Sequence, residues 1–232
     1  MEKAIIGGKE QERRAILVFV PKEADYRDKV LAYLSRSIGQ KITINAIRRD
    51  LGLSYGYLHS TIHKLRDEKI INIEEVGNYK LISLNFKNML TISELARITV
   101  KITQEIIVQN KKLRRLSRLI ESLRGYREIL SIVLFGSQAR QMQHEKSDID
   151  ILVIMGVEYK KSRPLINKLK VDIMSFATKE FLQIQSFIID YDIFKNMLKS
   201  KEEINVGKEV LKDGIVLEGY ENYWKMIGEM LE

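Results

Sequence analysis

Two different spacings of apolar residues divide this chain into two parts. Before about residue 125, apolar positions recur every three or four residues, which is typical of amphipathic helices. Leu58, Ile62 and Leu65 form one such stripe. Beyond Gly125, short apolar runs alternate with helical segments. That alternation predicts an α/β domain, so the sequence favours a two-part protein of mixed α and β structure.

The first part is expected to contain three short helices followed by a hairpin. Thr43 and Ser54 stand where helix N-caps are expected, and Gly52 stands where the second helix should end. Gly77-Asn78 suits the turn of a hairpin. The expected elements are a strand over 15–20, helices over 22–38, 44–51 and 55–69, and strands over 70–76 and 79–84.

This order of elements resembles the winged helix-turn-helix family along residues 22–86. The resemblance implies that the third helix enters the major groove of DNA. Its outward-facing candidates for nucleic-acid contact are Tyr55, Tyr57, His59, Ser60, His63 and Lys64. In the alternative interpretation, Tyr57 and one histidine support the core, and the module binds a protein or a second copy of itself.

A long basic helix is expected between the two parts. Thr91 and Glu94 have the spacing of a capping box, and neither Pro nor Gly occurs from there to Gly125. A heptad-like apolar seam predicts either packing on a neighbouring domain or a homodimer. Its other face carries candidate phosphate contacts, which are Arg114, Arg115 and Arg118. The predicted organisation is therefore residues 1–90, 91–127 and 128–232.

A glycine and a serine follow the first expected strand of the C-terminal part. The runs predicted as strands there are 129–135, 149–155, 171–176 and 214–217. Gly136 lets the backbone approach a ligand closely, and Ser137 can donate its hydroxyl proton to a phosphate oxygen. If a helix begins here, its free N–H groups form an anion site.

Acidic residues on the expected strands indicate a metal site. Asp148 and Asp150 are two positions apart on one strand, so both leave the same face with Cα atoms about 6.5–7 Å apart. Two carboxylates so close repel each other unless a cation lies between them, and hard oxygen ligands suit Mg²⁺. Asp172 lies in another apolar run and is expected to join them. Three acids beside a phosphate cradle are what two-metal phosphoryl transfer requires.

The motif Gly136-Ser137-x-Ala-Arg140, followed by Ser147-Asp148-x-Asp150, resembles the DNA polymerase beta nucleotidyltransferase superfamily. The nearest resemblance is to its minimal prokaryotic members, including those that act as antitoxins, over about 128–220. It implies that Asp148 and Asp150 bind two Mg²⁺ ions and that Asp172 binds the catalytic ion and activates the acceptor hydroxyl. Gly136, Ser137, Arg140 and Ser147 would contact the nucleoside triphosphate.

Charge and composition indicate the class of binding partner and the cellular compartment. Residues 1–127 carry 25 Lys and Arg against 14 Asp and Glu, whereas the remainder carries 14 against 17. A basic first part favours nucleic acid, DNA or RNA, as a partner. The chain has no cysteine and no apolar run long enough to span a membrane, and its start lacks a signal-peptide pattern, so a cytoplasmic protein is expected.

The predicted function is therefore transfer of a nucleotidyl group, AMP from ATP, to a hydroxyl acceptor. The acceptor is a nucleic-acid end or a side chain of a separate HEPN-type partner protein. In the alternative, the chain is a DNA-binding regulator or an antitoxin-like protein. Its transferase fold would then sense a nucleotide without turnover, or modify a partner protein.

Overall fold

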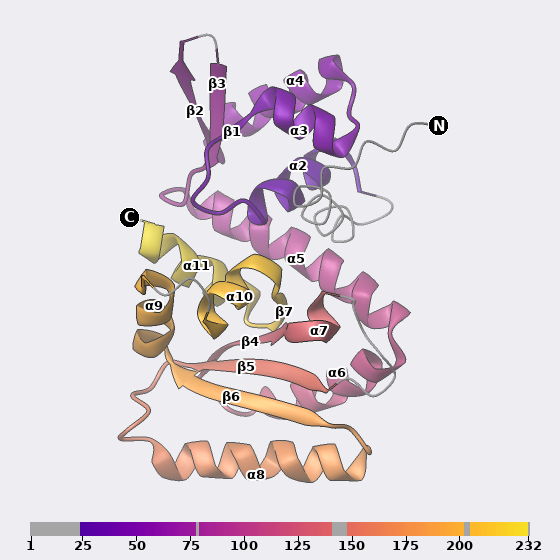
Figure 1. The fold of residues 1–232 in the computed structure, drawn as a ribbon, viewed down its shortest axis with the longest axis vertical. Coiled ribbons are helices and arrows are strands. Elements are labelled where there is room, and N and C mark those ends of the chain that lie inside the picture. The colour runs from indigo at the N-terminus through magenta and orange to yellow at the C-terminus, as the bar shows by residue number, and fades with distance from the viewer. Residues whose placement is uncertain (1–23, 78, 141–147, 202–204, 232) are drawn as a thin grey trace. The chain divides into compact units, whose positions relative to one another are not determined.

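A computed structural model of the chain describes residues 24–77, 79–140, 148–201 and 205–231 (Figure 1). They divide into two compact units. The first comprises the described residues of Met1–Ile102 together with those of Ile227–Glu232, and the second is Thr103–Met226. The division falls inside a helix rather than near residue 90 or 127. The strand expected over 15–20 lies outside the described residues.

The first unit contains the three helices and the hairpin expected from the sequence. The Thr43 hydroxyl accepts a hydrogen bond from the Ala46 amide, and Gly52 ends the same helix with a φ of 63°. The strands form an antiparallel sheet in the order β1-β3-β2. In chain order the elements are α2 (Tyr26–Ser35), β1 (Ile42–Thr43), α3 (Ile44–Leu51), α4 (Tyr55–Asp67), β2 (Ile71–Val76) and β3 (Tyr79–Leu84).

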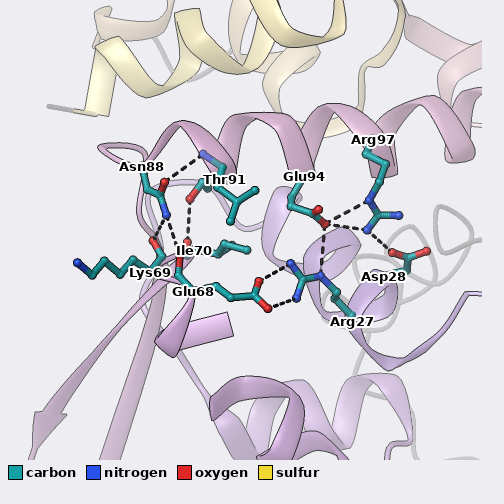
Figure 2. Close-up of polar contacts among 10 residues, drawn as sticks. Arg27, Asp28, Glu68, Lys69, Ile70, Asn88, Thr91, Glu94 and Arg97 are labelled. Carbon is teal, nitrogen blue, oxygen red and sulfur yellow. Dashed lines mark hydrogen bonds and ion pairs between the residues drawn. The ribbon is translucent and has the colours of Figure 1, made fainter. Parts of the chain in front are cut away.

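A polar network ties α2 to the first half of α5 (Met89–Gln109) and to the end of α4 (Figure 2). Arg27 binds Glu68 through two hydrogen bonds of 2.6 and 3.1 Å, and it binds Glu94 at 3.3 Å. The buried carboxylate of Asp28 accepts hydrogen bonds from Arg97 at 2.5 Å and Lys101 at 2.6 Å. The first unit is thus held together by ion pairs as well as by its apolar core.

The start of α5 differs from the expected capping box. The helix begins at Met89, and the side chain of Asn88 accepts a hydrogen bond from the Leu90 amide. Thr91 is buried and donates its hydroxyl proton to the Ile70 carbonyl at 3.2 Å. Figure 2 shows Glu94 turned toward the arginines instead of back toward Thr91.

The single helix expected from Thr91 to Arg124 is wrong, because the chain breaks at Asn110 into α5 and α6 (Lys111–Leu123). The Asn110 side chain accepts hydrogen bonds from the amides of Lys112 and Leu113. Asparagine favours such a cap because its side chain competes with backbone hydrogen bonds inside a helix. Helix α6 buries its leucines and leaves a basic face exposed.

The second unit is built on a mixed four-stranded sheet, in agreement with the predicted α/β domain. The strand order is β6-β5-β4-β7, in which β5 and β6 are parallel and the other pairs are antiparallel. The strands are β4 (Ile129–Phe135), β5 (Ile149–Met155), β6 (Ile184–Asp190) and β7 (Ile215–Glu218). The remaining helices are α7 (Gly136–Ala139), α8 (Arg163–Lys179), α9 (Tyr191–Lys199), α10 (Val206–Asp213) and α11 (Tyr220–Leu231).

The strand expected over 171–176 is wrong, since this segment lies in α8. Ile166, Leu169 and Ile173 are buried at helical spacing, whereas Val171 and Met174 are exposed. Helix α8 is the crossover that joins the parallel strands β5 and β6, and parallel pairing requires such a connection. Figure 1 shows α8 along one face of the sheet and α7 and α10 on the other face.

Candidate nucleotide and metal site

The turn that leaves β4 requires glycine. Gly136 has a φ of +70°, and a Cβ there would lie 2.3 Å from Oδ2 of Asp150. Any side chain at this position would therefore collide with the carboxylate. The same glycine opens α7, so the backbone of the Gly136-Ser137 turn lies directly against Asp150. Ser137 is half-buried.

Asp148 and Asp150 lie where the end of β4 meets the beginning of β5. Asp150 stands opposite Phe135 in the antiparallel pair and beside Gln185 in the parallel pair. Burial raises the pKa of Asp150, and the nearby charges of Asp148 and Glu209 raise it further, against an opposing effect of Arg140. The site therefore holds more negative charge than its own cation neutralises.

A neutral amide, Gln185, occupies the neighbouring strand position. Its Nε2 donates a hydrogen bond of 2.8 Å to Oδ2 of Asp148. Sequence reasoning missed β6 and this residue, because Gln185 and Ser186 interrupt the apolar run that would have marked a strand.

Asp172 does not converge on the other two acids. It is exposed on α8, where its carboxylate accepts a hydrogen bond from the Tyr126 hydroxyl. Tyr126 precedes the first residue of β4, whereas Asp150 stands opposite the last. The expected placement of Asp172 is thus corrected. Among the described residues, no three His, Asp or Glu side chains are grouped so that they could hold a metal ion.

Arg140 is engaged by acids of α10. Its Nη1 forms an ion pair with Glu209 and lies 4.0 Å from Oδ2 of Asp213. Glu209 therefore belongs to the surroundings of Asp150, although no sequence pattern singled it out. Ser147, the remaining candidate contact for the nucleotide, lies outside the described residues.

The candidate nucleic-acid residues of α4 differ in exposure. Tyr55 and Tyr57 are 57% and 70% exposed, so neither supports the core. Ser60 and Lys64 are also exposed. The two histidines, His59 and His63, are half-buried and contact each other.

On α6, two of the three candidate arginines have partners at Glu180. Arg115 donates a hydrogen bond of 3.3 Å to its carbonyl, and Arg118 forms an ion pair of 3.2 Å with its carboxylate. Arg114 is exposed. The basic face is thus partly occupied by contacts within the second unit.

Residues 117–220 match the model of a known family, Polymerase beta, Nucleotidyltransferase. The matched segment includes all four strands of the second sheet and supports membership of the nucleotidyltransferase superfamily and a nucleotidyl transfer function. Neither the curated proteins nor the solved structures include a significant match. Among the described helices, none combines the length and apolar character needed to cross a membrane.

Proposed function

We propose that the second unit is a Mg²⁺-dependent nucleotidyltransferase that transfers AMP from ATP to a hydroxyl acceptor. The acceptor oxygen forms a bond to the α-phosphorus, and the bond from that phosphorus to the pyrophosphate oxygen breaks. The observation that carries the proposal is the position of Asp150 directly against the Gly136 turn, with the charge of Asp148 close enough to act on it.

The residues present fit one divalent cation. Asp148 and Asp150 supply hard carboxylate oxygens two positions apart, and the pKa of Asp150 is raised by burial and then by the nearby negative charges, which a cation would balance. Mg²⁺ bound there would neutralise charge on the phosphate oxygens as pyrophosphate leaves. We propose one ion rather than two, since Asp172 lies elsewhere and Gln185 carries no charge.

The nucleotide is proposed to lie along the Gly136-Ser137 turn. The absence of a Cβ at Gly136 lets the Asp150 carboxylate lie against the backbone of this turn, and the Ser137 hydroxyl would donate to a phosphate oxygen. Arg140 is proposed to meet the triphosphate by exchanging one of its α10 carboxylate partners for phosphate.

The decisive experiment incubates the full chain with each α-labelled nucleoside triphosphate, Mg²⁺, and either nucleic-acid ends or candidate partner proteins. Label should move from ATP to an acceptor, and Asp150→Asn should abolish that transfer. Asp192→Asn is the matched control, because Asp192 is an exposed acid on α9. Transfer that persists in Asp150→Asn would refute the assignment.

One observation favours a second candidate function, a nucleotide-binding regulator without turnover. Gln185 occupies the strand position beside Asp150, where a carboxylate would complete a set of three acids. In that case labelled ATP would bind with Mg²⁺ and remain intact. Equilibrium dialysis followed by chromatography of the bound nucleotide separates this outcome from transfer.

For the first unit we propose a winged helix-turn-helix module that binds nucleic acid through α4. The order α2-β1-α3-α4-β2-β3 and the exposure of Tyr55, Ser60 and Lys64 support this proposal. On duplex DNA, the logarithm of the binding constant falls as the logarithm of the salt concentration rises. Each phosphate that a cationic side chain neutralises makes this slope more negative by about 0.9. Lys64→Glu should flatten that dependence, whereas no binding by the parent at low salt would favour a protein partner.

A further inference from the structure

Two histidines on α4 are arranged as a pair of ligands would be. His59 and His63 are separated by one helical turn, and their Nε2 atoms lie 3.1 Å apart. Two ring nitrogens bound to one tetrahedral zinc ion are about 3.3 Å apart, given Zn–N distances of about 2.0–2.1 Å. The ring centroids are 4.2 Å apart, so both imidazoles turn toward one point instead of spreading along the helix.

The paired rings line a small pocket between α4 and the β2–β3 hairpin. The pocket has a volume of about 190 Å³. Ile44, Ile62 and Ile73 form its apolar walls, and Glu75 of β2 contributes a carboxylate. Room for an ion with water ligands is therefore available beside the two nitrogens.

The charges around this pocket are balanced in pairs. Arg66 and Lys80 line it, which would oppose binding of a cation if they stood alone. Arg66 is paired with Asp67 at 2.8 Å, and Lys80 is paired with Glu75 at 3.4 Å. The immediate surroundings are thus close to neutral when both imidazoles are uncharged.

We propose that His59 and His63 together bind one divalent transition-metal ion of the zinc, nickel or copper class. Imidazole nitrogen suits these ions, whereas the carboxylates of Asp148 and Asp150 suit Mg²⁺, so the two sites select different metals. Without metal, one Nε2 carries the proton that the other accepts. A shift of that proton to Nδ1 of the same ring frees the second lone pair with no net proton release.

This site requires neither nucleotidyl transfer nor nucleic-acid binding. It lies in the first unit and uses none of the residues assigned to the nucleotide. The bound ion would add positive charge to the helix surface that carries Tyr55 and Lys64. Metal binding at His59 and His63 can therefore be tested separately from the proposed function.

The test titrates the full chain with Zn²⁺ by calorimetry in the presence of excess Mg²⁺, which occupies the carboxylate site. One zinc ion should bind. Loss of a residue that only hydrogen-bonds a metal ligand lowers metal affinity by about 10–100-fold. Loss of a ligand itself, in His59→Gln or His63→Gln, should therefore weaken zinc binding at least about tenfold. His144→Gln is the matched control, because the chain has three histidines and no cysteine.

Nitrogen NMR of the imidazoles in the parent protein provides a readout that does not depend on how the variants fold. Zinc should shift the Nε2 resonances of both His59 and His63. Unchanged Nε2 resonances would overturn the proposal and leave a simple hydrogen bond between the rings. It would also be overturned if His144→Gln, rather than the α4 variants, removed zinc binding.

Discussion

The side-chain amide of Gln185 donates a hydrogen bond to Asp148 across the parallel strands β5 and β6. The bond orients one carboxylate of the candidate site without adding charge to it. Asp150 lies beside Gln185 in the register, and its pKa is raised by burial and by the charges of Asp148 and Glu209, which outweigh the opposing charge of Arg140. The site is therefore built to accept a cation from outside.

Replacing Gln185 with glutamate should destabilise the metal-free protein. The change removes a solvent-exposed hydrogen bond, worth about 0.5–1.5 kcal/mol, and adds like-charge repulsion next to Asp148. Mg²⁺ should recover part of the loss, because the added carboxylate can serve as a ligand. Thermal unfolding in EDTA and in Mg²⁺ measures both effects. Equal unfolding temperatures for parent and variant in EDTA would contradict this interpretation.

Gly136→Ala should disable the site. The alanine would have to adopt a φ of +70° with its Cβ 2.3 Å from Asp150 Oδ2. Backbone strain of this kind costs about 1–3 kcal/mol, and displacement of the carboxylate should also remove Mg²⁺ binding. Gly125→Ala is the matched control, because the nearest atom there is 3.9 Å from the built Cβ. Urea unfolding and Mg²⁺ calorimetry should separate the two variants clearly.

Asp172→Asn should retain nucleotidyl transfer. Its carboxylate accepts a hydrogen bond from the Tyr126 hydroxyl, which precedes the first residue of β4, whereas Asp150 stands opposite the last. Burial, followed by the hydrogen bond to Asp172, raises the pKa of Tyr126 to about 12, so the variant should bring that pKa back toward 10. Tyrosine absorbance titration against a Tyr126→Phe reference reports this change. Loss of transfer in Asp172→Asn would instead assign the third acid to the catalytic site.

Asp150→Asn should stabilise the metal-free protein at neutral pH. The pKa of Asp150 is raised in the folded state, so this group favours folding below its unfolded pKa of about 3.9. That contribution is lost as pH rises through the folded pKa. The advantage of the variant should therefore be larger at pH 7 than at pH 4 when both proteins unfold in EDTA. An advantage independent of pH would rule out the carboxylate as its source.

Asp28→Asn should weaken the first unit by about 1.5–3 kcal/mol, the usual value of a hydrogen bond between charged groups. Burial alone would raise the pKa of Asp28, but the hydrogen bonds from Arg97 and Lys101 lower it overall. The resulting stability is present above the unfolded pKa and is lost as pH falls through the folded one. Denaturant unfolding from pH 7 to pH 2 tests this sign. Asp67→Asn, at an exposed acid, should change little.

Strand positions were predictable where apolar runs ended sharply. The bounds of β4 and β5 follow from uninterrupted apolar segments next to Gly136 and Asp148. The same reasoning failed over 171–176, because an acid among apolar residues suits both a strand and one turn of an amphipathic helix. In the structure Ile166, Leu169 and Ile173 are buried at the three- and four-residue spacing of a helix.

Long-range pairing explains the remaining differences. Gly136 was expected to admit a ligand, whereas in the structure Asp150 lies against it, and the approach of Gln185 depends on a crossover whose register no local pattern reveals. Asn110 was also missed, since a single asparagine interrupts a helix only when the surrounding packing favours a cap there.

The membership of Ile227–Glu232 in the first unit bears on how the chain folds during synthesis. A Cβ on Gly228 would lie 2.9 Å from a ring carbon of Phe86, so this stretch packs closely on a residue far earlier in the chain. Domains generally fold in order as they leave the ribosome. Here the first unit lacks its last segment until Gly228 has emerged, which follows the last strand of the second sheet in the chain.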